Sequence, residues 1–270
     1  MPELPEVETI VRGLANTIVG KRLARVEIRL AKIAVAPAHL DFSEALSGER
    51  IVGVRRRGKY AVVDLKSGRS LVTSLRMTGR LVVQGSRDPD FPGTHVILWL
   101  QGGRRLSFAD VRTFGRMRLV EAGERWDRDL GVEPLQSGFT PQAFMSMLSG
   151  RTTPIKAFLL DQRRIAGIGN IYACEALWEA RIRPNRPART LTGPAIDRLH
   201  DAVIDVLHRA IASRGTSVDD YVDAGGLRGG FQNDLAVYGR LGKPCRRCGR
   251  PIVRTVLGQR GTWWCRRCQR

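Results

Sequence analysis

The chain opens with the sequence MPELPEVE (residues 1–8), which holds three acidic residues and two prolines. Apolar residues then recur at helical spacing from Leu4 to Leu14, which predicts an amphipathic helix starting almost at the chain terminus. Proline suits the first turn of a helix because its missing N–H would have no partner there. Acidic residues in the same turn complement the positive end of the helix dipole.

Removal of Met1, which a small second residue usually permits, would leave Pro2 as the N-terminal residue. Its secondary amine, fixed by the helix beside Glu3 and Glu6, is then a candidate covalent nucleophile with acid and base partners. An ordinary helix with an acidic first turn explains the same residues. The rest of the chain must decide between these two interpretations.

The composition is strongly basic. Lys and Arg total 45 against 26 acidic residues, a formal net charge of +19, and the basic residues are spread along all 270 positions. This pattern favours a polyanionic partner, nucleic acid first, over a charge that serves solubility alone. There is no membrane-length apolar run and no signal peptide, so we expect a cytoplasmic, nucleoid-associated protein without membrane contact.

Short strand-like segments fill the first half of the chain. Turn signals such as Pro92-Gly93 and Gly102-Gly103 separate them. Strands at this density predict a β-sandwich or barrel that follows one helix. The segments are 25–30, 51–55, 60–65, 71–74, 80–83, 96–100, 104–108 and 117–120.

The pattern becomes helical after residues 130–138, which resemble a linker. The segment 224–230 contains four glycines and predicts a mobile loop that is too flexible to belong to the core. Helices are predicted at 141–148, 154–161, 171–179 and 194–214.

Two Cys-x2-Cys pairs near the end of the chain predict a metal site. Their spacing is typical of a tetrahedral four-thiolate zinc site formed by Cys245, Cys248, Cys265 and Cys268. Four protein ligands leave no open position, so this zinc is expected to be structural. Glycines between the pairs predict a β-hairpin with Arg260 near its tip, while Cys174 lies in a helical pattern and is expected in the core.

The segment 161–172, DQRRIAGIGNIY, predicts a helix, a Gly-x-Gly turn and a second helix, with Asn170 as N-cap. The free amides at such a turn can bind a phosphate. A purely structural helix hairpin is the alternative. Arg151 and Lys156, around the start of the preceding helix, are weaker phosphate candidates that could equally be solvated surface charges.

Other candidates for DNA contact lie at turns. Lys59 begins a strand pattern and is either a solvated lysine or a phosphate ligand. Met77, Arg112 and Phe114 together could form an apolar and cationic wedge that enters a base stack; core packing with a solvated arginine is the alternative. His95 is the histidine of interest, while the other histidines are expected in loops or on helix surfaces: His39, His200 and His208.

Seven motifs in order give this chain a close resemblance to the formamidopyrimidine-DNA glycosylase family, Fpg type. They are PELPEVE (2–8), RGKY (57–60), LRMTG (75–79), VRTFGR (111–116), GIGNIY (167–172), VYGR (237–240) and the four cysteines. The resemblance implies an α+β multidomain fold. Residues 1–130 would form the N-terminal helix and β-sandwich, 131–140 a linker, 141–236 a helix–two-turn–helix domain with a lesion-recognition loop at 216–230, and 237–270 the zinc finger.

The resemblance also implies base-excision repair of damaged double-stranded DNA. Such an enzyme is a glycosylase and AP lyase, which excises 8-oxoguanine and formamidopyrimidines through a Schiff base on Pro2, followed by β,δ-elimination. Zinc would be structural, with no redox cofactor, and we expect a monomer. Glu3 would be the acid and Glu6 its support. Phosphates would be held by Lys59, Asn170 and Arg260. Further DNA contacts would come from His95, Arg151 and Lys156. The space that the flipped nucleotide leaves in the base stack would be filled by Met77, Arg112 and Phe114.

Three departures from the commoner family pattern concern DNA binding and lesion preference. Ser74 stands where members usually carry a phosphate-contacting histidine, which weakens one expected contact; Thr78 and the segment 226–230 also differ. One alternative is an endonuclease VIII-like enzyme for oxidised pyrimidines, which Met77 and the Arg112-x-Phe114 pair disfavour. Another is a non-catalytic zinc-containing DNA-binding protein, which the intact Pro2-Glu3 pair disfavours.

Overall fold

The computed structural model describes residues 2–218 and 221–270. The chain divides into two compact units, which are described separately. The N-terminal unit comprises Met1–Arg128 and Ser213–Gly230, and the C-terminal unit comprises Asp129–Ala212 and Phe231–Arg270.

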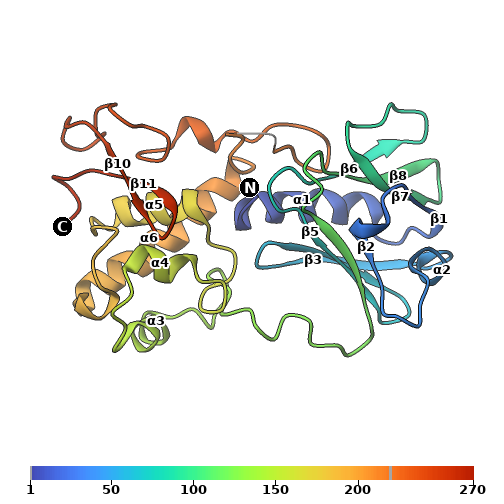
Figure 1. The fold of residues 1–270 in the computed structure, drawn as a ribbon, viewed down its shortest axis with the longest axis horizontal. Coiled ribbons are helices and arrows are strands. Elements are labelled where there is room, and N and C mark those ends of the chain that lie inside the picture. Colours follow the sequence, from blue (N-terminus) through green and yellow to red (C-terminus); the bar gives the residue numbers. More distant parts are fainter. Residues whose placement is uncertain (1, 219–220) are drawn as a thin grey trace. The chain divides into compact units, whose positions relative to one another are not determined.

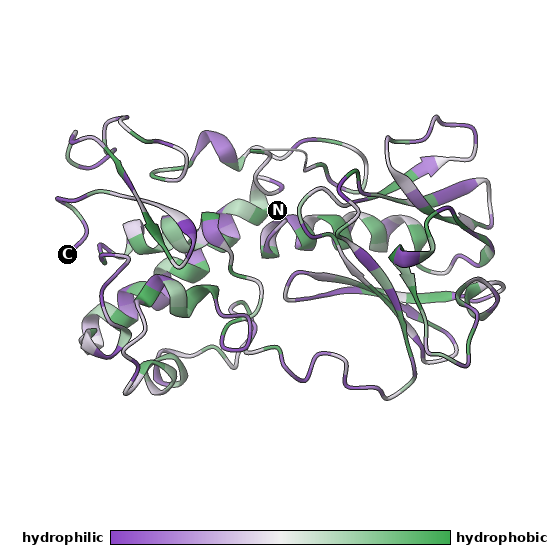
Figure 2. Cartoon of the chain, viewed as in Figure 1, coloured by the Kyte–Doolittle hydropathy of each residue, from purple (hydrophilic) through white to green (hydrophobic). Residues whose placement is uncertain are grey.

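The N-terminal unit is organised around helix α1 (Leu4–Ile18), as its apolar periodicity predicts (Figure 1). One face of α1 is buried, including Leu4, Val7 and Leu14, and apolar and polar residues alternate along the helix in Figure 2. The helix contacts strands of both sheets of this unit. Its first turn is therefore fixed by the core behind it.

Two sheets form the predicted β-sandwich. The four-stranded sheet has the order β1-β7-β8-β6, and the five-stranded sheet β2-β9-β5-β4-β3, with only the short β2–β9 pair parallel among the described strands. A short helix, α2 (Phe42–Leu46), adds to the unit. The strands are β1 (Leu23–Ile28), β2 (Ala34–Val35), β3 (Ile51–Arg57), β4 (Tyr60–Leu65), β5 (Ser70–Ser74), β6 (Arg80–Gly85), β7 (Thr94–Leu100), β8 (Arg104–Ala109) and β9 (Arg116–Val120).

The C-terminal unit contains the four predicted helices and the predicted hairpin. Helix α6 (Gly193–Ala212) contacts both α3 (Pro141–Leu148) and α5 (Asn170–Glu179). Helix α4 is Ile155–Leu160, and the hairpin consists of β10 (Val253–Leu257) and β11 (Arg260–Trp264). The hairpin turn, Gly258-Gln259, has positive φ at both residues, which matches the twist of a two-stranded ribbon.

The expected linker is packed into the C-terminal unit. Val132 forms a bridge with Ile165, and the Gly131 N–H donates to the Gln162 carbonyl at 2.9 Å. A Cβ on Gly131 would lie 2.2 Å from the backbone of Arg164, so a glycine is required there. Glu133 of this segment is also buried, with 5% of its surface exposed, as expected for a segment that belongs to the folded unit.

Two expectations about burial were wrong. His200 is buried on α6, where its Nε2 lies 2.8 Å from the Phe139 carbonyl oxygen and its ring stacks on Phe139. The glycine-rich segment begins with a core residue, since Ala224 is 4% exposed and belongs to the same apolar cluster as α1. The segment 213–230 therefore packs with the N-terminal unit, although the sequence places it after the helices.

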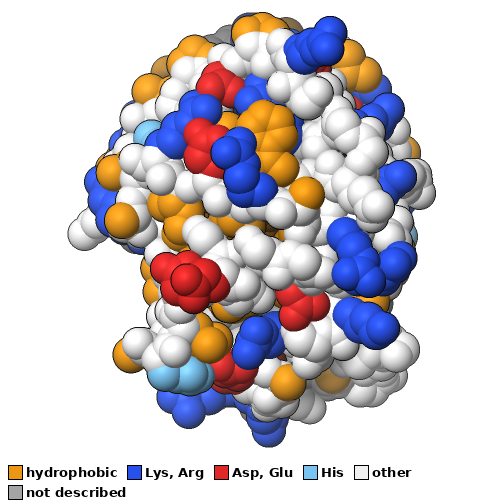
Figure 3. All heavy atoms as spheres, turned by 90° about the vertical axis from the view of Figure 1, so that its right-hand side faces the viewer, with side chains coloured by type: hydrophobic (Ala, Val, Ile, Leu, Met, Phe, Trp, Pro, Cys, Tyr) orange, Lys and Arg blue, Asp and Glu red, His pale blue; other side chains and the backbone are white. Residues whose placement is uncertain are grey.

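The surface carries the excess of basic residues. Lys and Arg side chains are spread over the face in Figure 3, with smaller groups of Asp and Glu between them. Within residues 2–218 and 221–270, no helix is both long and apolar enough to cross a membrane.

Candidate functional site

The start of α1 is a buried acidic turn. Pro2 is buried, and Glu3 and Glu6 are 2% and 1% exposed. The Glu3 N–H donates to Glu6 Oε2 at 2.7 Å, one half of a capping box in which Glu3 is the N-cap. Pro2 is thus held immediately before the positive end of a 15-residue helix, beside two carboxyl groups.

Glu6 connects this turn to the segment that follows α6. Its Oε1 accepts the Thr216 N–H at 2.7 Å, and its backbone carbonyl accepts the Tyr221 hydroxyl at 3.3 Å. Burial, reinforced by the negative charge of Glu6, raises the pKa of Tyr221, so the hydroxyl stays protonated and remains a donor. One acidic side chain therefore positions both the helix start and the loop expected to cover a lesion.

Lys59 and Ser74 lie at one end of the five-stranded sheet. Lys59 is in the two-residue turn between β3 and β4, where Gly58 has the positive φ that such a turn requires. Ser74 is half-buried at the end of β5 and is paired with Tyr60 and Arg116 on the neighbouring strands. The sheet register thus brings the Lys59 turn close to the position of the expected histidine.

The predicted wedge residues are exposed on two loops. Met77 is 42% and Phe114 52% exposed, and the Arg112 guanidinium lies 4.9 Å from the centroid of the Phe114 ring. Both loops contain a strained residue of positive φ, Arg76 and Thr113. Exposed apolar side chains on such loops fit insertion into a base stack better than core packing.

Asp110, which was not among the sequence-predicted site residues, joins these two loops. This fully buried carboxylate accepts the Thr78 hydroxyl, the Arg112 N–H at 3.2 Å and the Gly115 N–H at 2.7 Å. The Asp110 carbonyl also lies 2.9 Å from Nε2 of His95; because a carbonyl only accepts, that nitrogen carries the proton. The position of this acidic residue, directly before the VRTFGR motif, was the sequence signal that could have identified it.

In the C-terminal unit, Lys156 is a buried connector. Its side chain is 0% exposed, and Nζ donates to Asn170 Oδ1 at 2.6 Å, to Thr262 Oγ1 at 2.7 Å and to the Gly261 carbonyl at 3.1 Å. These bonds join the start of α5 to the zinc hairpin. The lysine is therefore not a solvated surface charge.

Asn170 is not the N-cap that the sequence predicts. The N-cap of α5 is Gly169, and Asn170 is the first helical residue. Its amide instead donates to the Gly261 carbonyl at 3.0 Å while its oxygen accepts from Lys156. The hairpin thus fixes the Asn170 side chain at the first turn of α5.

The remaining phosphate candidates of this unit are on its surface. Arg260, the first residue of β11, directly precedes Gly261 and is exposed. Arg151 is exposed between α3 and α4. Asn170 bonds to the residue that follows Arg260 on the hairpin, and the buried Lys156 bonds to both Asn170 and this part of the hairpin.

The four cysteines fit a zinc ion. Their Sγ atoms all lie within 4.8 Å of one another, with Cys245–Cys268 at 3.9 Å and Cys248–Cys265 at 3.5 Å. Tetrahedral ligands at about 2.3 Å from zinc would be roughly 3.8 Å apart. Although burial opposes the thiolate, hydrogen bonds from Trp178 and from backbone amides lower the pKa of Cys245 to about 6, which favours a metal ligand.

The zinc module, which comprises residues 237–270 with the four cysteines and the β10–β11 hairpin, is anchored to α5. Cys174 is fully buried against it, as predicted for a core residue. The buried Glu175 carboxylate accepts the N–H groups of Ala236, Val237 and Tyr238 at 2.7–3.0 Å. The same helix therefore bears Asn170 at its first residue and supports the metal site from its centre.

Family models match nearly all of the chain. Residues 1–117 match the formamidopyrimidine-DNA glycosylase N-terminal domain, 130–222 its H2TH domain, and 242–270 the zinc finger found in FPG and IleRS. The chain belongs to the formamidopyrimidine-DNA glycosylase family.

Relatives and solved structures of this family are similar over the whole length. The formamidopyrimidine-DNA glycosylase of Pelotomaculum thermopropionicum is 46% identical, covering 100% of this chain and 99% of its own, and that of Moorella thermoacetica is 49% identical over 94% of each. A Lactococcus lactis FPG mutant bound to Fapy-dG-containing DNA superposes with a TM-score of 0.93 at 34% identity, covering all of both chains. The MutM (FPG) protein of Thermus thermophilus gives a TM-score of 0.89 at 42% identity, covering 99% of this chain and 98% of its own.

Proposed function

We propose that this protein is a base-excision repair enzyme, a DNA glycosylase and AP lyase that removes oxidised purines from duplex DNA. The observation that carries the proposal is the buried start of α1, where Pro2 precedes the capping box of Glu3 and Glu6. Membership of the family supports the same reaction. A purely DNA-binding protein would need neither the amine nor the two buried carboxyl groups.

The reaction requires a flipped nucleotide, because a base cannot be attacked within the stack. Insertion of Met77, Arg112 and Phe114 would fill the space that the flipped nucleotide leaves in the base stack. Asp110 supports this role because it holds both loops through three donors. Phosphates on either side would be held by Lys59, Asn170 and Arg260.

The chemistry begins with the Pro2 amine, whose protonated form is disfavoured by the positive end of the adjacent helix. Its nitrogen attacks C1′ of the sugar as the bond from C1′ to the base breaks, and the base leaves with a proton. Glu3 donates a proton to the ring oxygen, the C1′–O4′ bond breaks, and the nitrogen, having lost its own proton, forms an iminium with C1′. A secondary amine gives an iminium with no N–H to lose, so the positive charge persists.

The iminium then drives strand cleavage. It acidifies the C2′ proton, which passes to a base such as the Glu3 carboxylate left by the preceding proton transfer, and the C3′–O bond breaks to expel the 3′ phosphate in β-elimination. Loss of the C4′ proton in a second, δ-elimination breaks the C5′–O bond and expels the 5′ phosphate, and water releases the sugar remnant from Pro2. Zinc takes no part in these steps, because all four of its ligand positions would be cysteines.

Oxidised pyrimidines are the second candidate substrate. A wild-type Lactococcus lactis FPG, 34% identical to this chain, has been solved in complex with an oxidised pyrimidine-containing DNA. The purine assignment rests on Met77 and the Arg112-x-Phe114 pair, and both lesion classes must therefore be compared.

The test uses end-labelled duplexes with 8-oxoguanine opposite cytosine, an oxidised pyrimidine, or no lesion. We expect cleavage of the 8-oxoguanine strand with phosphate at both new ends, at a higher kcat/KM than for the pyrimidine. Faster pyrimidine cleavage would support the endonuclease VIII-like alternative. Tight lesion binding without cleavage would support the non-catalytic one.

A further inference from the structure

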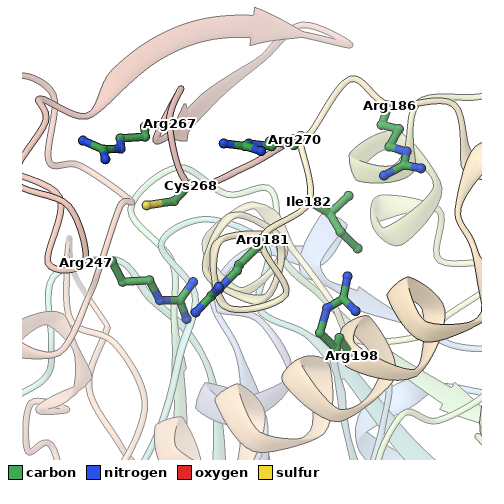
Figure 4. A pocket seen from close by; sticks show the side chains of 8 residues that line it. All are labelled: Arg181, Ile182, Arg186, Arg198, Arg247, Arg267, Cys268 and Arg270. Carbon is green, nitrogen blue, oxygen red and sulfur yellow. The ribbon is translucent and has the colours of Figure 1, made fainter.

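A pocket of about 560 Å3 in the C-terminal unit is lined almost entirely by arginines (Figure 4). Ile182 and Cys268 complete its lining, which includes no acidic side chain among the described residues. The six arginines come from the segment that follows α5, from α6 and from the zinc finger: Arg181, Arg186, Arg198, Arg247, Arg267 and Arg270.

The pocket is separate from the residues expected to hold the lesion strand. Asn170 begins α5, whereas Arg181 follows the end of this helix, about 16 Å away at 1.5 Å per residue. Arg260 is near the tip of the hairpin, whereas Cys268 lies beyond its base, and the strand between them is roughly 15 Å long. The arginine pocket thus lies at the opposite end of both elements.

Part of the charge has a structural explanation. Arg247 donates to the carbonyls of Trp178 and Glu179 and to the Glu179 carboxylate at 2.6 Å, which caps the negative end of α5. Arg186 donates to the side chain and carbonyl of Thr190. These two arginines would be needed without any ligand.

The side chains of Arg181, Arg198 and Arg267 have no such explanation. None of the three forms a side-chain hydrogen bond or ion pair with the described residues. In Figure 4 the guanidinium of Arg181 lies next to that of Arg247, and Arg198 points from α6 toward Ile182. Like charges gathered around one pocket repel each other and destabilise the folded chain unless an anion neutralises them.

We propose that this pocket binds an anion with several closely spaced phosphate groups. Guanidinium forks match phosphate oxygens in bidentate geometry and stay charged at every physiological pH. The volume falls in the usual range of about 300–1,000 Å3 for small-ligand sites, and fits an oligophosphate group. This site is independent of base excision, and two sources share its chemistry: a free oligophosphate and the backbone of a second DNA segment.

The test is a calorimetric titration of tripolyphosphate into the zinc-loaded full chain, saturated with a duplex containing an uncleavable abasic analogue. We expect one binding event per protein alongside the bound duplex. In Arg181→Gln/Arg198→Gln the affinity should fall by at least about tenfold, because each substitution removes a charge-assisted hydrogen-bond donor to phosphate. The matched control, Arg189→Gln/Arg250→Gln, removes the same charge from exposed positions outside the pocket and should bind as the native chain does.

Two further measurements make the result decisive. Zinc content and thermal unfolding are followed for each variant, and the single Arg198→Gln on the surface of α6 replaces the double variant if that one unfolds. A lesion-free duplex in place of tripolyphosphate identifies the source: sensitivity to the same substitutions would assign the DNA backbone. Equal weakening in the control, displacement of the abasic duplex by tripolyphosphate, or no binding would each overturn the proposal.

Discussion

Two buried residues contribute to this site by positioning neighbouring side chains and loops, and not by contacting DNA themselves. Lys156 and Asp110 are fully buried, and each links two segments that bear candidate DNA contacts. Neither role was predictable from the sequence, because each depends on partners distant along the chain. The sequence did identify the side chains that these residues position.

Lys156→Met should weaken DNA binding without removing a phosphate contact. The substitution deprives Asn170, Gly261 and Thr262 of a donor, and an unsatisfied buried group costs about 1–3 kcal/mol. We expect roughly tenfold weaker binding of lesion DNA by fluorescence anisotropy.

The salt dependence distinguishes positioning from direct contact. Arg260→Gln, which removes a proposed phosphate contact, should reduce the magnitude of the slope of log K against log salt by about 1. Lys156→Met should leave this slope unchanged. A reduced slope in Lys156→Met would show that the lysine itself neutralises a phosphate.

Asp110→Asn should loosen the wedge loops. The new amide places a donor against the donors at Thr78, Arg112 and Gly115, so we expect about 1–3 kcal/mol less stability in urea unfolding. Insertion into DNA, followed by 2-aminopurine fluorescence opposite the lesion, should become slower. Asp197→Asn, exposed on α6, is the control, and identical behaviour of the two variants would contradict the role of Asp110.

At the scale of elements, periodicity and turn signals predicted most helices and strands. The apolar pattern of α1 and the spacing of short strands depend on local sequence and were confirmed. Three local interpretations failed for tertiary reasons. Asn170 bonds to Lys156 and the hairpin, His200 is buried against Phe139, and Ala224 of the glycine-rich segment packs in the core with α1.

The ion pair of Glu8 with Arg56 attaches α1 to β3 and should make stability depend on pH. Although partial burial opposes ionisation, hydrogen bonds from Arg56 and Arg12 hold the pKa of Glu8 below its ordinary 4.5. The stabilisation is therefore complete above about pH 4.5 and is lost as the pH falls through the lower folded-state pKa. Urea unfolding between pH 7 and 3 should show that the free energy of unfolding falls less at acid pH in Glu8→Gln than in the native chain. An unchanged pH profile would count against a stabilising role of the ion pair.

At the scale of the whole molecule, the zinc module should act on DNA binding through the hairpin. Loss of one thiolate in Cys265→Ser would free the hairpin that supplies the Gly261 carbonyl to Asn170. We expect stoichiometric zinc to be lost and lesion DNA to bind at least tenfold more weakly, on the order of 1.4 kcal/mol. Cys174→Ser, on α5 outside the four-thiolate site, should retain zinc, and full DNA affinity in zinc-free protein would contradict the module's role.

Attack of the Pro2 amine on the sugar would leave a covalent intermediate that borohydride can trap. Reduction of the reaction with 8-oxoguanine-containing duplex should give a covalent protein–DNA adduct, which peptide mass spectrometry should locate at Pro2. The adduct should be lost in Pro2→Gly and in protein that retains Met1, although the latter should still bind the lesion. An adduct on another residue, or one of full yield with Met1 in place, would contradict the account.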